Sequence, residues 1–158
     1  MSADDELVPT REGYDRWAEI YDEEANPLVM IEESEVARAL GDVAGRAILD
    51  VGCGTGTFAL MLKRRAPSAT VFGLDPDPQA LDMARRKARR ADADITFLQG
   101  FANDTLIKPL RPLTKIVISL VLHQTPVKEK LRILNTCRHV LGPDGEVHIA
   151  DYGEQLGL

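Results

Sequence analysis

One glycine-rich stretch of this chain combines residue types that suit the binding of a charged small molecule. It begins with Asp50 and continues with Gly52, Gly54 and Gly56 at every second position. Glycine has no Cβ, so a backbone of this composition can approach a ligand closely. We expect a helix to begin near Thr55. Its unpaired N–H groups would point at the same place and favour an anionic group such as a carboxylate or a phosphate.

A second acid follows the glycine stretch, at a position that suits the binding of a ribose. Beyond Gly56, an apolar run over residues 70–74 ends in Asp75. An acid at the end of the second strand of such a unit can accept hydrogen bonds from both hydroxyls of a ribose. Together the glycine stretch and Asp75 predict a bound nucleoside. A glycine-rich turn that joins a strand to a helix without any ligand is the less favoured interpretation.

The elements that must position these residues alternate between short apolar runs and amphipathic runs. This alternation predicts an α/β fold, a doubly wound, mostly parallel Rossmann-like sheet of about five strands with helices on both faces. The expected strands are 47–51, 70–75, 95–99, 116–121 and 146–151. The expected helices are 11–24, 29–40, 55–65, 78–90 and 127–141. Within this arrangement residues 1–10 are expected to be disordered, 11–45 to form an N-terminal helical lid, and 46–158 to form the core.

The composition limits the classes of partner. The chain has 158 residues and a formal net charge of -6, so no general attraction to nucleic acid or to anionic membranes is expected. Its longest apolar run, 116–122, is far too short to span a bilayer. The two cysteines, Cys53 and Cys137, are interpreted as small buried thiols in a reducing cytoplasm. No spacing among the histidines and cysteines suggests a metal site.

The motifs resemble those of the class I S-adenosylmethionine-dependent methyltransferases. Dinucleotide-binding folds use a related fingerprint, G-x-G-x-x-G, but Thr57 stands here in place of its third glycine. The order Asp-x-Gly-x-Gly-x-Gly over residues 50–56, followed by Asp75, is similar to the first two methyltransferase motifs. Residues 14–22 resemble the helix that covers the cofactor in many small-molecule members. Residues 116–124 are similar to the fourth strand with its following S-x-x-L-H-H loop, and residues 131–145 resemble the helix and turn before strand five.

The resemblance implies S-adenosylmethionine as cofactor and a direct displacement at its methyl carbon by a small-molecule acceptor. The glycine stretch would lie against the methionine and ribose, Asp75 would take the ribose hydroxyls, and two N-terminal tyrosines would close the lid. Asp50 would orient the amino-acid end, Phe101 and Ala102 would border the adenine, and Ser119 would touch the methionine end. The cofactor-binding residues expected on this basis are Tyr14, Tyr21, Asp50, Gly52, Cys53, Gly54, Thr55, Gly56, Asp75, Pro76, Phe101, Ala102 and Ser119.

His123 is the best candidate for a general base. It follows a central strand at its carboxyl end, where α/β sheets place their ligands, and imidazole transfers protons near neutral pH. The alternative is a histidine that only hydrogen-bonds within the loop and shapes the pocket. His139 and His148 are interpreted as structural. The side chains that hint at an apolar acceptor are Val29, Met30, Leu120, Val121 and Tyr152.

The chain departs from the family pattern in three places. Phe101 replaces the usual aspartate after the third strand, and Thr114-Lys115 stand where an aspartate is usual before the fourth. The two further strands that would complete the sheet are not found after the fifth. We therefore expect an uncapped strand edge at 146–151, which could pair with a second copy as a homodimer, because exposed edges are usually protected.

Two functions from different classes remain open at this point. The first is an active small-molecule methyltransferase, and the second is a non-catalytic cofactor-binding or scaffold subunit, which the shortened sheet favours. A nicotinamide-dependent oxidoreductase is disfavoured by Thr57 and by the absence of a Tyr-x-x-x-Lys pair. Nucleotide hydrolysis is disfavoured because the chain has no G-x-x-x-x-G-K-[ST] loop.

Overall fold

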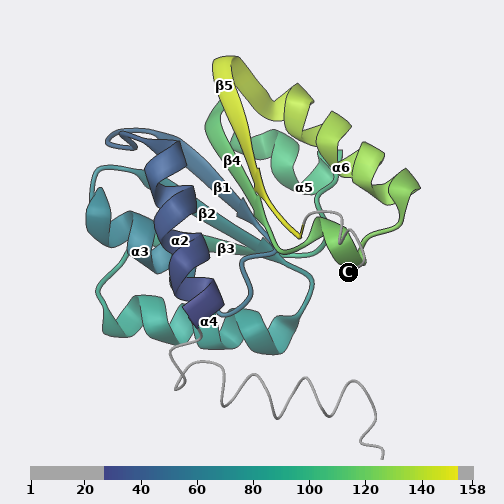
Figure 1. Ribbon diagram of the computed structural model, residues 1–158. Helices are drawn as coiled ribbons and strands as arrows, with labels where there is room; N and C mark the ends of the chain where they lie inside the picture. The colour runs from purple at the N-terminus through teal and green to yellow at the C-terminus, as the bar shows by residue number, and fades with distance from the viewer. Residues whose placement is uncertain (1–26, 153–158) are drawn as a thin grey trace, which may run out of the picture.

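The computed structural model describes residues 27–152, and its centre is a five-stranded parallel sheet (Figure 1). The strand order is β3-β2-β1-β4-β5. The strands are β1 Ala47–Val51, β2 Thr70–Asp75, β3 Ile95–Gln99, β4 Leu113–Ser119 and β5 Leu141–Ala150. This topology confirms the predicted doubly wound α/β fold.

Helices cover both faces of the sheet (Figure 1). On one face lie α2 Pro27–Leu40, α3 Thr57–Arg65 and α4 Pro78–Arg90, and on the other lie α5 Asp104–Ile107 and α6 Val127–Val140. Two short 3-10 turns, η1 Lys108–Leu110 and η2 Leu122–Gln124, complete the described elements. The three long helices α2, α4 and α6 fall close to their predicted ranges.

Two cores form because successive side chains of a strand point to opposite faces of the sheet. In β1, Ile48 packs with residues of α2 and α3, whereas Leu49 packs with residues of α5 and α6. In β4, Val117 joins the first cluster and Ile116 the second. All four side chains are fully buried, and burying one such side chain stabilises the fold by about 2 kcal/mol.

The first boundary that differs from prediction is the start of α3. The helix begins at Thr57 rather than near Thr55, because Gly56 is its N-cap in the left-handed conformation with φ 76°. The chain tightens before the helix through a 2.8 Å hydrogen bond from the Gly56 N–H to the Cys53 carbonyl. The glycine loop therefore reaches further along the chain than the sequence pattern indicated.

The last two strands also differ from their predicted ranges. β4 begins three residues early, at Leu113, and ends at Ser119 because Leu120 has φ 51°, which a strand does not accommodate. β5 begins at Leu141, and its register passes from the pair Leu113–Leu141 to the pair Lys115–Glu146. Residues 142–145 therefore bulge out opposite the single residue 114, and the predicted turn lies within the strand rather than before it.

Several expectations lie outside the described residues. They are the disorder of residues 1–10, the helix 11–24, and the lid contacts of Tyr14 and Tyr21. Of the predicted lid, the structure describes residues 27–45, and there Val36, Leu40 and Val43 are buried in the core on the α3 face. Within residues 27–152 no helix is long and apolar enough to cross a membrane.

The strand order places a crevice between β1 and β4. The chain proceeds from β1 toward β2 and β3 on one side, and from β4 to β5 on the other. In open α/β sheets, ligands bind outside the carboxyl ends of the strands at this point of reversal. The loops after β1, β2, β3 and β4 all converge there, and they carry most of the residues predicted to act.

Candidate functional site

The glycine loop after β1 is held against the end of β2 by its own backbone. The N–H groups of Gly52 and Cys53 both donate to the Leu74 carbonyl, at 2.7 and 3.1 Å. Gly52, Gly54 and Gly56 all have positive φ, between 51 and 76°. L-residues adopt such angles at a cost of about 1–2 kcal/mol each, so this loop requires glycine at alternate positions.

The three glycines serve different purposes. A Cβ at Gly52 would lie 2.2 Å from a methyl group of Val121, and one at Gly56 would lie 2.8 Å from the Cβ of Ala84. These two glycines therefore allow close packing against the loop after β4 and against α4. A Cβ at Gly54 would meet nothing within 4 Å. Gly54 thus presents bare backbone to open space, as the approach of a ligand requires.

Asp75 lies at the carboxyl end of β2 and is only 9% exposed. Its two oxygens accept hydrogen bonds from the N–H groups of Gly54 and Asp77, each at 2.9 Å. Burial raises the pKa of Asp75, and these two backbone donors oppose that rise. A carboxylate has about four acceptor positions, so lone pairs remain for ribose hydroxyls beside the glycine loop.

Asp50 and Cys53 are both buried, within the loop and the strand that leads to it. Burial raises the pKa of the Cys53 thiol, and the negative charges of Asp50 and Asp75 raise it further. A raised pKa favours the protonated thiol, which is a poor nucleophile. The prediction that both cysteines are buried free thiols is confirmed for Cys53 and Cys137.

Lys87 reaches from α4 to the start of α3. Its Nζ donates to the hydroxyls of Thr55 and Thr57, at 2.9 and 3.1 Å. Thr55 was predicted to contact the cofactor, and it lies within the glycine loop beside the open space at Gly54. These contacts brace the turn between the loop and the helix.

A cavity of about 380 Å³ lies at the carboxyl ends of the strands. Its walls come from the loops after β1, β2, β3 and β4 and from the first turns of α6, and they are mainly apolar. The predicted residues Gly52, Pro76, Phe101 and Ala102 all line it. Phe101 is 65% exposed, so its ring is available to a ligand. The other described residues predicted for the site are not among the lining residues: Asp50, Cys53, Gly54, Thr55, Gly56, Asp75, Ser119 and His123.

His123 belongs to a hydrogen-bonded pair that joins the ends of β4 and β5. Its Nδ1 lies 2.8 Å from an oxygen of Asp151, the residue that follows β5. The other Asp151 oxygen accepts from the backbone N–H groups of Leu122, at 2.6 Å, and His123, at 3.0 Å. Burial of Asp151 opposes its ionisation, but hydrogen bonds from Tyr152, His123 and Leu122 outweigh this and lower its pKa.

The second ring nitrogen of His123 is held by a neighbour that lines the cavity. Its Nε2 lies 2.9 Å from the amide nitrogen of Gln124. The ring also meets Tyr152 edge-on, with centroids 4.9 Å apart. Just before this loop, Leu120 has φ 51°, a conformation that is rare for a residue with a side chain and that concentrates near functional sites.

Asp151 and Gln124 are the site residues that sequence reasoning missed. The sequence predicts Asp151 at the end of the strand 146–151 and Gln124 at the end of the motif 116–124, with no chemical role for either. The available signal was topological. An acid at the carboxyl end of β5 must lie beside the loop that follows β4, because the two strands are neighbours in a parallel sheet.

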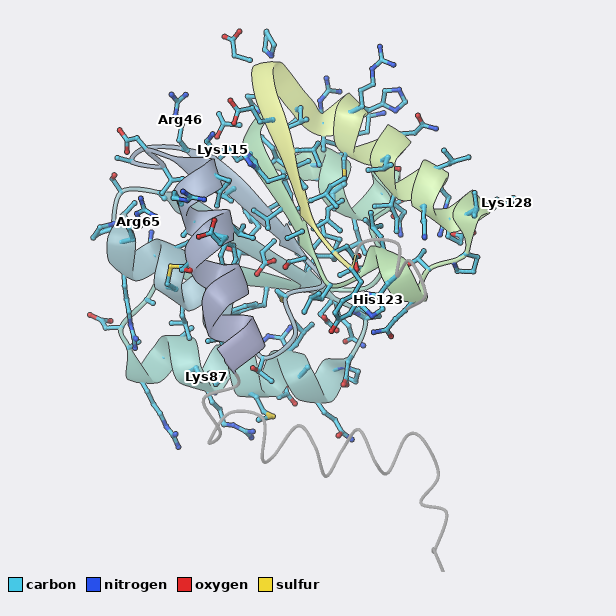
Figure 2. The ribbon with its side chains drawn as sticks, viewed as in Figure 1. Arg46, Arg65, Lys87, Lys115, His123 and Lys128 are labelled. Carbon is cyan, nitrogen blue, oxygen red and sulfur yellow. The ribbon has the colours of Figure 1, made fainter. Side chains whose placement is uncertain are left out.

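The unusual pair Thr114-Lys115 has a structural explanation at the opposite end of the sheet. The Thr114 hydroxyl bonds both the N–H and the carbonyl of Ala47 at 2.9 Å. Lys115 donates to Glu146 on β5 at 2.6 Å, and the ring of His148 bonds the same Glu146 oxygen at 2.9 Å. This supports the interpretation of His148 as structural. Figure 2 shows Lys115 and His123 at opposite ends of the strands.

A family model described as a methyltransferase domain matches residues 48–145, from β1 into the bulge of β5. The chain belongs to the class I S-adenosylmethionine-dependent methyltransferases. The cofactor of this family, S-adenosylmethionine, fits the residues present, because Gly54 leaves bare backbone facing open space beside the Asp75 carboxylate.

Individual relatives within this family are named for different kinds of substrate. It is 33% identical to a demethylmenaquinone methyltransferase of Thermus thermophilus over 109 residues, which are 69% of this chain and 48% of that protein. It is 34% identical to a ribosomal RNA small subunit methyltransferase C of Hahella chejuensis, over 70% of this chain and 32% of that protein. The chain thus spans half or less of the length of these relatives.

The fold is shared with a solved structure, that of a putative O-methyltransferase from Nostoc punctiforme. The TM-score is 0.72 at 18% identity, over 94% of this chain and 44% of that one. At this level of identity the likeness concerns the fold alone.

Proposed function

We propose that this methyltransferase chain transfers the methyl group of S-adenosylmethionine to a hydroxyl of a small, largely apolar molecule. The observation that carries this proposal is the continuity of the cavity. Gly52, Pro76 and Phe101 form its cofactor side, and Gln124, whose amide touches the ring of His123, forms its other side. A proton acceptor therefore lies one side chain away from the cavity.

On the cofactor side, the roles follow the contacts. The loop around Gly54 lies against the methionine and ribose, Asp75 accepts hydrogen bonds from the ribose hydroxyls, and Phe101 borders the adenine. Like Gly54 and Asp75, Asp50 and Ser119 are not among the lining residues, and we propose that they act on the methionine end. We also propose that Tyr14 and Tyr21 close a lid over the bound cofactor.

The protein's chemical contribution is alignment, exclusion of water and removal of one proton. S-adenosylmethionine, when bound, supplies a methyl group that is already strongly electrophilic. The acceptor oxygen would receive this methyl group, and the cofactor would leave as S-adenosylhomocysteine. The acceptor's O–H proton passes to Nε2 of His123, and the Asp151 carboxylate stabilises the imidazolium that results.

The apolar walls and the relatives support a small acceptor. Val121, Pro126 and Ile133 line the cavity with hydrocarbon, which suits an apolar ring better than a polar chain. The relative from Thermus thermophilus is named for a quinone-type small molecule, and the one from Hahella chejuensis for ribosomal RNA. The net charge of -6 favours the first kind of acceptor.

The experiment begins with calorimetric titration of the purified chain with S-adenosylmethionine, S-adenosylhomocysteine and, as a negative control, NAD. We expect micromolar binding of both adenosyl ligands and no heat with NAD. Turnover is then measured by release of S-adenosylhomocysteine with two panels of acceptors, apolar phenols and structured RNA. Turnover with phenols alone supports the proposal, and turnover with RNA alone overturns it. Binding of cofactor without turnover on either panel indicates the non-catalytic, cofactor-binding subunit.

Two further parts of the proposal concern the oligomeric state of the protein and its location in the cell. β5 is an edge strand of the described sheet, with Glu146 and Ile149 about half exposed, and we propose that it pairs with a second copy. A strictly monomeric mass by light scattering at high concentration would contradict that pairing. The two buried, free thiols suit a cytoplasmic location, which is reducing.

A further inference from the structure

The hydrogen bonds around His123 define which of its ring nitrogens carries the proton. All four contacts that the structure gives to the Asp151 carboxylate come from nitrogen atoms: the N–H groups of Leu122, His123 and Tyr152, and Nδ1 of the His123 ring. An ionised carboxylate can only accept hydrogen bonds, so Nδ1 must donate. The lowered pKa of Asp151 keeps it ionised at neutral pH.

The contact on the other side of the ring agrees with this assignment. With its proton on Nδ1, the neutral ring has an acceptor at Nε2, and the Gln124 amide nitrogen, a donor, lies 2.9 Å from it. Both neighbours of the ring thus favour the same tautomer. Gln124 lines the cavity, so the residue that contacts Nε2 is also one that a molecule bound there can meet.

We propose that Asp151 and Gln124 are positioning residues that hold His123 as the Nδ1-protonated tautomer, with Nε2 reserved for an acceptor hydroxyl that displaces the Gln124 amide. The inference rests on the proposed function, since it specifies the base and the chemical class of acceptor for that reaction. An acceptor must offer an O–H donor to replace the amide at Nε2. A tertiary amine or a thioether has no such donor and gains nothing from this arrangement.

The substitution Asp151→Asn tests the first part, because the backbone constrains how the new amide can sit. One oxygen position of the side chain receives two backbone N–H groups, from Leu122 and His123, and the other receives one, from Tyr152, so the amide oxygen belongs at the first. The amide NH₂ group then faces Nδ1 and donates to it. This should drive the proton of the ring to Nε2, as happens when the corresponding acid of a serine-protease triad is changed to asparagine.

The measurement is a long-range proton–nitrogen NMR correlation on protein labelled with ¹⁵N-histidine, at a pH where neutral imidazole dominates. We expect a pyridine-type signal from Nε2 in the natural protein and from Nδ1 in Asp151→Asn. His139 and His148 are internal references whose signals should not move. Asp144→Asn, an exposed change of the same kind in the bulge of β5, is the matched control and should leave the tautomer unchanged.

The substitution Gln124→Leu tests the second part. It removes the donor at Nε2 while Asp151 stays, so we expect the tautomer to persist and the Nε2 signal to shift. A proton on Nε2 in the natural protein, an unchanged tautomer in Asp151→Asn, or an unmoved Nε2 signal in Gln124→Leu would each overturn the proposal. If Asp151→Asn fails to fold, the natural protein and Gln124→Leu still decide it.

This measurement needs neither cofactor nor acceptor. A failure of the tautomer assignment is therefore distinguishable from a failure of S-adenosylmethionine to bind in calorimetry. With a phenol acceptor, Asp151→Asn should lower kcat about 10²–10⁴-fold, the range for loss of general-base catalysis, and leave cofactor affinity unchanged. A merely structural Asp151 would instead lower cofactor affinity and kcat together.

Discussion

The two sides of the cavity are built in different ways. On the side of β1 and β2 the ligand-facing surface is backbone, held by bonds from Gly52 and Cys53 to Leu74 and from Gly54 to Asp75. On the side of β4 and β5 it includes the side chain of Gln124, whose amide contacts His123, and His123 in turn pairs with Asp151 beyond the strand ends. In the proposed function, the first side would bind the cofactor common to the family, and the second could change its chemistry without rebuilding the fold.

This difference implies different sensitivities to substitution. A change in the backbone side disturbs packing as well as binding, because Gly52 and Gly56 have neighbours within 3 Å of where a Cβ would stand. A change in the side-chain side should remove chemistry and leave the fold intact, since His123 and Gln124 are both exposed. Substitutions on each side can test this contrast.

The largest effect is expected on the side-chain side, from His123→Ala. Loss of a general base should lower turnover about 10²–10⁴-fold at saturating acceptor, with calorimetric affinity for S-adenosylmethionine unchanged. His139→Ala, an exposed histidine on α6, is the matched control and should keep full turnover. If His123→Ala turns over normally, His123 only shapes the pocket, and the contrast between the two sides fails.

On the backbone side, Asp75→Ala should weaken S-adenosylmethionine binding at least tenfold, about 1.4 kcal/mol, because the ribose loses its acceptor. The control is Asp77→Ala, which removes the N-cap of α4 and its 2.8 Å bond to the Gln79 N–H. That change should cost about 1 kcal/mol of stability and leave affinity unchanged. Equal losses of affinity in both variants would show that Asp75 acts through the fold alone.

The backbone side is also the part of the site that the sequence predicts well. Gly52, Gly54 and Gly56 could be placed in a loop because positive φ angles favour glycine, and Asp75 at a strand end because an acid directly follows an apolar run. Their contact with the cofactor stays a prediction. The five strands were found for a related reason, since buried strands in a parallel sheet are short continuous apolar runs. Of these strands, β1, β2 and β3 have the predicted bounds.

The side-chain side could not be predicted in the same way. The pairing of His123 with Asp151 joins residues 28 positions apart, and only the neighbouring positions of β4 and β5 bring them together. The end of β4 was also missed, since the apolar run continues through Val121, whereas Leu120 turns out of the strand with a positive φ. Local sequence carries no signal for either event.

A smaller loss of cofactor affinity is expected from Gly54→Ala, for which Gly45→Ala is the matched control. Both glycines have positive φ and neither would bring a Cβ within 4 Å of another atom, so the two changes carry similar backbone strain, about 1–2 kcal/mol. Only Gly54 lies in the loop that faces the cofactor. Its methyl group should weaken S-adenosylmethionine binding about fivefold, or ~1 kcal/mol, while Gly45→Ala leaves affinity unchanged. Equal affinities would indicate that the cofactor does not approach this backbone.

The smallest effect is expected in the pH dependence of protein stability, to which Asp75 and Asp151 should contribute with opposite signs. In the folded state the pKa of Asp75 is raised above its usual value of 3.8. The folded protein therefore binds this proton more tightly than the unfolded chain does. The stability that this contributes is lost as the pH rises above 3.8 through the folded pKa. The folded pKa of Asp151 is lowered, so its contribution is present above 3.8 and is lost as the pH falls through the window below.

The corresponding asparagine variants should therefore behave in opposite ways. In urea unfolding followed between about pH 3 and pH 6, Asp75→Asn should become more stable relative to the natural protein as the pH rises, because the decline is removed. Asp151→Asn should become less stable relative to it over the same rise, because the stabilising carboxylate is gone. If the relative stabilities of both variants change in the same direction as the pH rises, folding shifts the pKa values of both acids in the same direction. The two sides of the cavity would then not differ in their electrostatics.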